Sequence, residues 1–149
     1  DTKYEIRDTK YEIRDTKYGE NLDLRITKYD ASGGVEYFIS YENPELDAIY
    51  GYARLRHTSD ENFIIRELKV VGRVAPLRAE RGHESEINER SPFTIQHQGI
   101  GKNLVAECEK IAIENSAKKI FVVSGVGVRN YYRRLGYELK NNYMVKTIW

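Results

Sequence analysis

The sequence predicts an α+β fold of the α/β-sandwich kind, with a central mixed sheet and flanking helices. Four β-rich runs separated by short turns predict an antiparallel meander. An amphipathic helix, a short apolar run and a second short helix follow, and such a run between helices is typical of a buried parallel strand. Strands and helices in this order form a layered domain around one core.

Alternation and turn residues define the meander. Leu22, Leu24 and Ile26 alternate with charged residues, as in a half-buried strand. Segments rich in Gly, Pro, Asn and Asp separate this run from the next three. Those three runs cover residues 35–41, 49–56 and 63–71. Strands joined by such short links pair as antiparallel neighbours.

The second half of the chain is predicted to carry the helices. Residues 72–98 lack periodicity and predict a long loop, which in a compact domain is usually functional. An apolar face at helical spacing predicts a helix over residues 100–115. A buried strand, a short helix ended by Gly136 and a last strand complete the chain. They cover residues 119–124, 128–135 and 143–149.

The first 18 residues repeat a seven-residue unit. DTKYEIR occurs twice, and a third copy begins at Asp15. Each unit offers only Tyr and Ile, two positions apart, which is strand spacing rather than the pattern of a coiled coil. The segment is neutral, with five acidic and five basic residues. We therefore expect a domain over residues 19–149, with residues 1–18 as an extension or an artefact.

The composition excludes several classes of protein. The chain has 149 residues, 40% hydrophobic and 32% charged, which predicts one soluble globular domain. A net charge of +1 argues against an electrostatically driven nucleic-acid binder, although a local basic patch is compatible with it. No apolar run is long enough to span a bilayer. The single cysteine, Cys108, excludes an internal disulfide, a multi-cysteine zinc site and a protein-held iron–sulfur cluster, and favours a reducing, cytoplasmic compartment.

Two motifs could carry chemistry. Residues 96–101 read QHQGIG just ahead of the predicted helix, where glycines admit a ligand to the backbone and unpaired N–H groups can hold a pyrophosphate. The alternative is a helix-start turn that requires a positive φ. Residues 131–137 read YYRRLGY, which by spacing alone is typical of a helix that anchors itself in the core and ends in a glycine cap.

Taken together, the motifs resemble a known family. A meander, a long loop, Q-x-x-G-x-G, a buried strand and Y-x-x-x-G-Y follow one another as in the GCN5-related N-acetyltransferase superfamily. The runs IRELKV, QHQGIG and SGVGVRNYY resemble more narrowly the acetyltransferase-like domain of the Elongator catalytic-subunit family, in its archaeal type, which modifies the wobble uridine of tRNA. The resemblance covers residues 21–149.

The resemblance also implies something that the chain lacks. That family places a radical-SAM domain, with a three-cysteine iron–sulfur motif, ahead of this domain, so the iron–sulfur cluster and S-adenosylmethionine would belong there. We therefore expect a fragment or a stand-alone relative that does not run the whole tRNA reaction alone. Lys69 stands where the family has histidine, and residues 78–90 are more charged than the family's loop.

The implied co-substrate is acetyl-CoA, held in a cleft between two parallel strands that splay apart. The backbone of the first strand would align the acetyl-pantetheine arm, and N–H groups at the helix start would cradle the pyrophosphate. The implied binding residues are Glu67, Leu68, Lys69, Val70, Gln98, Gly99, Ile100, Gly101, Lys102, Asn103 and Tyr132.

Two residues are implied to take part in the chemistry. Tyr132 matches the superfamily tyrosine near the thioester sulfur, where a phenol can hydrogen-bond or protonate a departing thiolate, and Tyr131 then points to the core or the acceptor side. Glu67 matches the strand position of a general base; the alternative is a cleft carboxylate paired with Arg66 or another basic residue. His83 and His97 are interpreted as structural or solvated.

Three functions remain open. The motif match favours an acetyl-CoA-binding module of a tRNA-modifying enzyme, with tRNA and other Elongator-type domains or subunits as partners. The alternatives are a free-standing N-acetyltransferase for protein lysine or a small amine, and a non-catalytic interaction domain. A basic group could contact tRNA phosphates weakly, or could be a solvated helix face. Its members are Arg129, Arg133, Arg134, Lys140 and Lys146.

Overall fold

The computed structural model describes residues 4–15, 20–71 and 92–149, with side chains from residue 22 in the second range and from residue 99 in the third. One sheet of eight strands runs in the order β1-β2-β3-β4-β5-β6-β8-β7. The strands are β1 (Tyr4–Asp15), β2 (Glu20–Ala31), β3 (Gly34–Asn43), β4 (Ala48–Ser59), β5 (Asn62–Val70), β6 (Lys119–Val122), β7 (Glu138–Lys140) and β8 (Tyr143–Thr147). The helices are α1 (Pro92–Glu114) and α2 (Arg129–Arg134), with a 3-10 turn η1 (Val126–Val128) before α2.

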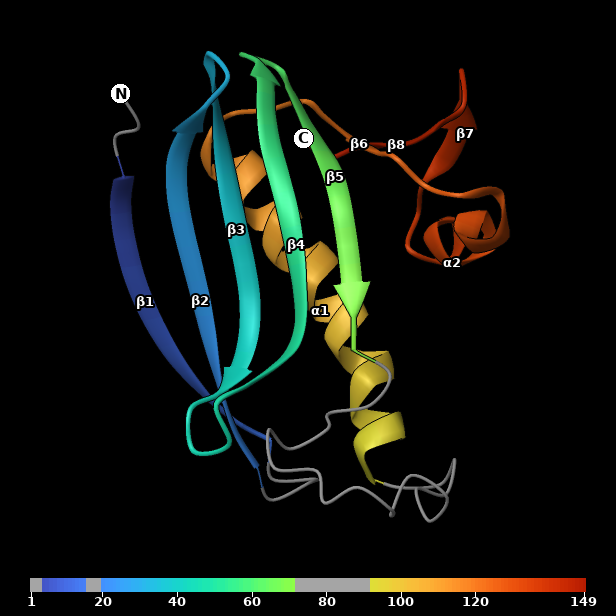
Figure 1. The fold of residues 1–149 in the computed structure, drawn as a ribbon. Helices are drawn as coiled ribbons and strands as arrows, with labels where there is room; N and C mark the ends of the chain where they lie inside the picture. Colours follow the sequence, from blue (N-terminus) through green and yellow to red (C-terminus); the bar gives the residue numbers. More distant parts are fainter. Residues whose placement is uncertain (1–3, 16–19, 72–91) are drawn as a thin grey trace.

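The predicted α+β class and the mixed sheet are confirmed. Strands β2 to β5 form the antiparallel meander, and β6 then pairs parallel to β5. The long helix α1 lies across one face of the meander (Figure 1). Ile39, Ala53 and Ile65 are fully buried beneath it. Alternate residues occupy the opposite face, here called the outer face, where no helix of the described ranges lies.

The end of α2 confirms the predicted glycine cap. Gly136 has a φ of +94°, in the left-handed region that glycine adopts without strain. The Gly136 N–H donates to the Arg133 carbonyl and the Tyr137 N–H to the Tyr132 carbonyl, both at 3.0 Å. This is the hydrogen-bond pattern of a Schellman motif, and it fixes the direction in which the chain leaves α2.

The helix α1 begins earlier than the sequence predicts. We expected residues 72–98 to form a loop and the helix to start near residue 100, because glycines favour a boundary. The structure starts α1 at Pro92, a residue suited to the first helical position because its missing N–H would be unpaired there. Gly99 and Gly101 therefore lie inside the helix. The rest of the predicted loop, residues 72–91, lies outside the described residues.

The repeat supplies the edge strand. Strand β1 pairs antiparallel with β2, with Tyr4 opposite Tyr29 and Tyr11 opposite Leu24. Because Tyr29 and Leu24 are an odd number of residues apart on β2, the two tyrosines that pair with them take register positions on opposite faces. The domain boundary expected at residue 19 stays a prediction, while residues 4–15 belong to the sheet. Neither described helix has the length and apolar character needed to cross a membrane.

Candidate functional site

The parallel strands β5 and β6 are paired along only part of β5. Their register ends at Ile65 and Val122, and the Val123 N–H donates to the Ile65 carbonyl at 3.1 Å. Strand β5 continues to Val70. The two strands therefore separate after Ile65, and residues 66–70 present one edge that β6 does not cover. We call this gap between the two strands the strand opening.

A β-bulge lies where the strand opening begins. Leu55 of β4 pairs with Ile65, but the preceding Arg54 pairs with Glu67, so Arg66 is an extra residue in β5. A bulge bends its strand and increases the local twist. This bend directs β5 away from β6.

Backbone polar groups face the strand opening. The Val71 N–H donates to the Tyr50 carbonyl at 2.9 Å, so this residue faces β4. The directions of the backbone N–H and C=O groups alternate along a strand. Those of Lys69 therefore also point toward β4, whereas those of Leu68 and Val70 point toward the opening. An extended ligand arm could bind there as an added strand does.

The first half of α1 packs close to β4 and β5. A Cβ on Gly51 would lie 2.9 Å from Ile100 and 3.1 Å from Leu104, so only glycine permits this approach of the helix. Ile100 and Leu104 are both buried. The helix is thereby held with Gly101 beside the end of β5.

Three elements meet at Gly101. A Cβ at this position would lie 2.8 Å from the Tyr131 hydroxyl of α2 and 3.2 Å from Cγ2 of Val70 in β5. The Tyr131 hydroxyl is buried and has no hydrogen-bond partner among the described residues. Burial raises the pKa of Tyr131, which keeps its proton available for donation. An unpaired buried donor at the strand opening suits a ligand that can accept a hydrogen bond.

Tyr132 lies deeper than its neighbour. Its side chain is 4% exposed, and its ring packs edge-on against Tyr131 at 5.2 Å and against Tyr137 at 5.8 Å between centroids. Burial raises the pKa of Tyr132. The sequence selected Tyr132 for the ligand and placed Tyr131 toward the core or the acceptor side, and in the structure the Tyr131 hydroxyl lies beside Gly101.

Glu67 projects onto the outer face and is engaged there. It accepts a hydrogen bond from the Tyr52 hydroxyl at 2.6 Å and forms an ion pair with Arg54 Nε at 3.0 Å. The hydrogen bond from Tyr52, together with Arg54, lowers the pKa of Glu67. A general base works best with a pKa near the working pH, so this environment favours the paired-carboxylate interpretation over the base. The partner is Arg54 rather than Arg66.

The predicted pyrophosphate segment lies within α1. Residues Gln98 and Gly99 are in its second turn, and Ile100 is buried against the sheet. Lys102 and Asn103 are exposed. Within a helix each N–H donates to the carbonyl four residues earlier. These N–H groups are therefore paired in the structure, whereas the sequence predicted them to be unpaired.

The other predicted residues are dispersed. Lys146 does not belong to an exposed basic group, because its ammonium donates to Glu109 at 2.9 Å and to the Leu135 carbonyl at 3.0 Å. The other four members lie on α2 and β7, where Arg129 is half-buried. His83 lies outside the described residues, and only the backbone of His97 is described.

The family can be stated from these features and from comparison with known proteins. The profile of the Acetyltransferase (GNAT) family matches residues 4–137, so the chain belongs to this family. Its fold is that of a GNAT acetyltransferase, as the motifs predicted.

Individual relatives show which members of the family this chain is similar to. The chain is 45% identical over 130 residues to Elongator complex protein 3 of Homo sapiens, a match covering 80% of this chain and 22% of that protein. It is 39% identical over 138 residues to the tRNA uridine(34) acetyltransferase of Methanocaldococcus jannaschii, a match covering 87% of this chain and 24% of that protein. The solved structure of Methanocaldococcus infernus Elp3 with an N-terminal deletion matches with a TM-score of 0.68 and 37% identity, covering 89% of this chain and 30% of that one. The chain thus spans about a quarter of these curated relatives, and the resemblance inferred from the motifs is confirmed.

Proposed function

We propose that this chain is the acetyl-CoA-binding acetyltransferase unit of an enzyme that modifies the wobble uridine of tRNA. The observation that carries the proposal is the strand opening, where Val70, Gly101 and the Tyr131 hydroxyl, which has no partner in the described part of the chain, meet. The names of the relatives support the tRNA substrate. Acetyl-CoA supplies an activated acetyl group. We also propose that a radical-SAM domain with its iron–sulfur cluster and S-adenosylmethionine, and further Elongator-type subunits, complete the cytoplasmic enzyme.

The chain's own groups would hold the two ends of acetyl-CoA. Backbone N–H and C=O groups of Leu68 and Val70 would pair with the amides of the pantetheine arm. The Tyr131 hydroxyl would donate a hydrogen bond to the arm beside Gly101. Lys102, which is exposed, could reach the pyrophosphate with a charge-assisted contact.

In this proposal the pyrophosphate binds to a helix that begins later than the Pro92 start of α1 in the structure. We propose that residues 92–98 leave the helix on binding and that N–H groups from Gly99 to Asn103 become the free helix start. Two glycines in three residues support this, because each is about 1 kcal/mol less favourable than alanine inside a helix. Acetyl-CoA should therefore reduce the helical circular-dichroism signal.

Two assays test the function on this chain. Calorimetric titration with acetyl-CoA should show saturable binding. If no binding is measured, the remaining alternative is a non-catalytic interaction domain. Acetyl-CoA hydrolysis with and without tRNA then distinguishes a unit of a tRNA-modifying enzyme from a free-standing N-acetyltransferase. Stimulation by tRNA supports the proposal. Acetylation of a lysine peptide without tRNA, lost in Glu67→Gln, would support the free-standing N-acetyltransferase instead.

Tyr131→Phe is expected to weaken acetyl-CoA binding about fivefold, the net worth of one hydrogen bond of about 1 kcal/mol. The melting temperature should stay equal or rise, because the hydroxyl has no described protein partner to lose. Calorimetry and thermal denaturation measure the two effects. Unchanged affinity would remove Tyr131 from the ligand site.

Tyr132→Phe is the matched variant on the next residue. The raised pKa of Tyr132 opposes proton transfer to a thiolate, so we expect its hydroxyl to hold the ligand: affinity falls by about 1 kcal/mol and the chemical step is spared. A fall of roughly 10²–10⁴-fold in rate at constant affinity would assign the acid role instead. Wild-type affinity together with wild-type turnover would show that the Tyr132 hydroxyl has neither role and that the residue only packs in the core.

A further inference from the structure

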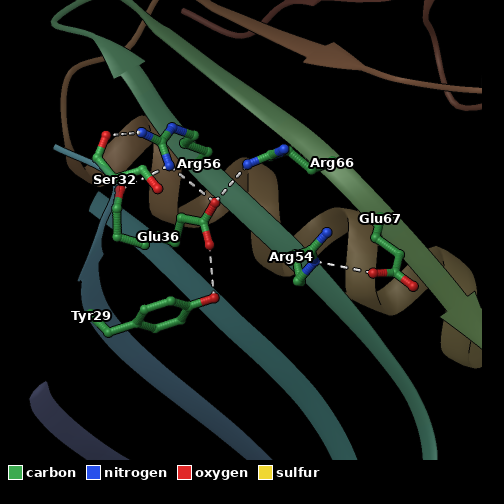
Figure 2. Close-up of polar contacts among 8 residues, drawn as sticks. Tyr29, Ser32, Glu36, Arg54, Arg56, Arg66 and Glu67 are labelled. Atoms are coloured by element: carbon green, nitrogen blue, oxygen red, sulfur yellow. Dashed lines mark hydrogen bonds and ion pairs between the residues drawn. The ribbon is translucent and has the colours of Figure 1, made fainter. Parts of the chain in front are cut away.

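A buried carboxylate connects four strands on the outer face. Glu36 of β3 is only 4% exposed, although it faces away from α1. Its Oε1 accepts hydrogen bonds from Arg56 Nη1 of β4 at 3.2 Å and from Arg66 Nη1 of β5 at 3.0 Å. Its Oε2 accepts one from the Tyr29 hydroxyl of β2 at 2.8 Å. Figure 2 shows these contacts converging on the one side chain.

Arg56 extends the cluster to the turn between β2 and β3. Its guanidinium donates to the Ala31 carbonyl at 3.0 Å and to the Ser32 carbonyl at 3.2 Å. Burial raises the pKa of Glu36, but the hydrogen bonds from Tyr29, Arg56 and Arg66 outweigh this and lower it overall. Glu36 is therefore ionised at neutral pH and firmly placed.

The hydrogen bond from Arg66 connects Glu36 to the strand opening. It is the extra residue of the bulge at which β5 leaves β6, and its side chain reaches past β4 to Glu36 on β3. The guanidinium is about half exposed, so packing alone does not hold it. The hydrogen bond to a fixed, buried carboxylate therefore restricts the conformations available to the bulge.

We propose that Glu36 is a positioning residue that acts through Arg66: it fixes the bulge of β5 and thereby the width of the strand opening in which the pantetheine arm of a CoA thioester binds. The inference rests on the proposed function for the ligand. Glu36 itself lies on β3, contacts the edge of the opening through Arg66 and takes no part in the chemistry.

Three variants and a control test this role. Glu36→Gln keeps the shape and removes the charge. Arg66→Met removes the link to the bulge but leaves Glu36 paired with Arg56 and Tyr29, so it is expected to fold. Arg66→Lys retains a cation for Glu36. Glu42→Gln is the control, because Glu42 lies on the same strand and face and pairs with Arg25 at 3.7 Å, away from the bulge.

The affinity for CoA, measured by calorimetry, is the first readout. We expect Glu36→Gln and Arg66→Met each to weaken binding about tenfold, the size of one hydrogen bond to a charged group. Their double variant should be no weaker than either alone, since both break the same link. Arg66→Lys should recover most of the affinity, and Glu42→Gln should bind as the wild type does. Additive losses, or an equal loss in Glu42→Gln, would overturn the proposal in favour of a general effect on stability.

Amide resonances of the free protein are the second readout, and they need no ligand. Those of residues 67–70 should shift and exchange faster in Glu36→Gln and Arg66→Met, while those of the β2–β3 turn should remain unchanged in Arg66→Met. Unchanged resonances at residues 67–70 would overturn the role of Glu36 even if CoA binds. If the wild type binds no CoA, the proposed function fails, and these resonances still decide whether Glu36 sets the bulge.

Discussion

Gly99→Val is expected to abolish acetyl-CoA binding while the free protein stays folded and as stable as the wild type. Gly99 is exposed, and a Cβ there would meet nothing within 4 Å. Valine also fits a helix better than glycine does. In the loaded protein, however, a branched side chain would keep the pyrophosphate from several N–H groups, each worth about 1.5–3 kcal/mol to a charged acceptor. Calorimetry should show a loss of about 100-fold or more.

Two further variants make the result specific. Ala106→Val places the same side chain on an exposed position of the same helix and should leave affinity unchanged. Gly101→Val should lose binding and stability together, because its Cβ would meet Tyr131 and Val70. Wild-type affinity in Gly99→Val would show that the pyrophosphate does not bind at this segment.

Local patterns were sufficient for most of the fold. Alternating apolar residues such as Leu22, Leu24 and Ile26 report which face of a strand is buried, so the meander could be read directly from them. A continuous apolar run likewise identified β6 as a buried parallel strand. Gly136 marked the end of α2 because few other residues adopt a φ of +94° without strain.

Helix boundaries and very short strands were not predictable in the same way. Glycine has low helix propensity, so Gly99 and Gly101 favoured a helix start, yet packing of Ile100 and Leu104 on the sheet outweighs that cost of about 1 kcal/mol per glycine. Strand β7 has three residues, too few for an alternation to be visible.

The site was predicted as a set of segments but not as a set of contacts. Glu67 was found by its place on β5, whereas its pairing with Tyr52 and Arg54 depends on the register between β4 and β5. The contact of Glu36 with Arg66 joins residues 30 apart on strands that are not neighbours. Such contacts follow from tertiary register, which no local pattern contains.

Lys146 illustrates the same point and yields a large expected effect. Sequence position placed it in a basic surface group, but its ammonium bonds to Glu109 of α1 and the Leu135 carbonyl after α2, and lies 5.6 Å from the centre of the Tyr137 ring. Lys146→Ala would leave the Glu109 carboxylate, whose side chain is 16% exposed, without its cation. Breaking a part-buried pair costs about 2 kcal/mol, less than a fully buried one because Lys146 is a third exposed. The melting temperature should fall by about 6 °C.

Lys140→Ala provides the comparison, because Lys140 is exposed on β7 and was assigned to the same basic group. We expect its melting temperature to equal that of the wild type. Binding of tRNA at several salt concentrations separates the two roles, because loss of a phosphate contact lowers the affinity and reduces the salt dependence by about one ion. Lys146→Ala should keep the salt dependence of the wild type at temperatures where it is folded. A reduced salt dependence at an unchanged melting temperature would place Lys146 on the RNA instead of between the two helices.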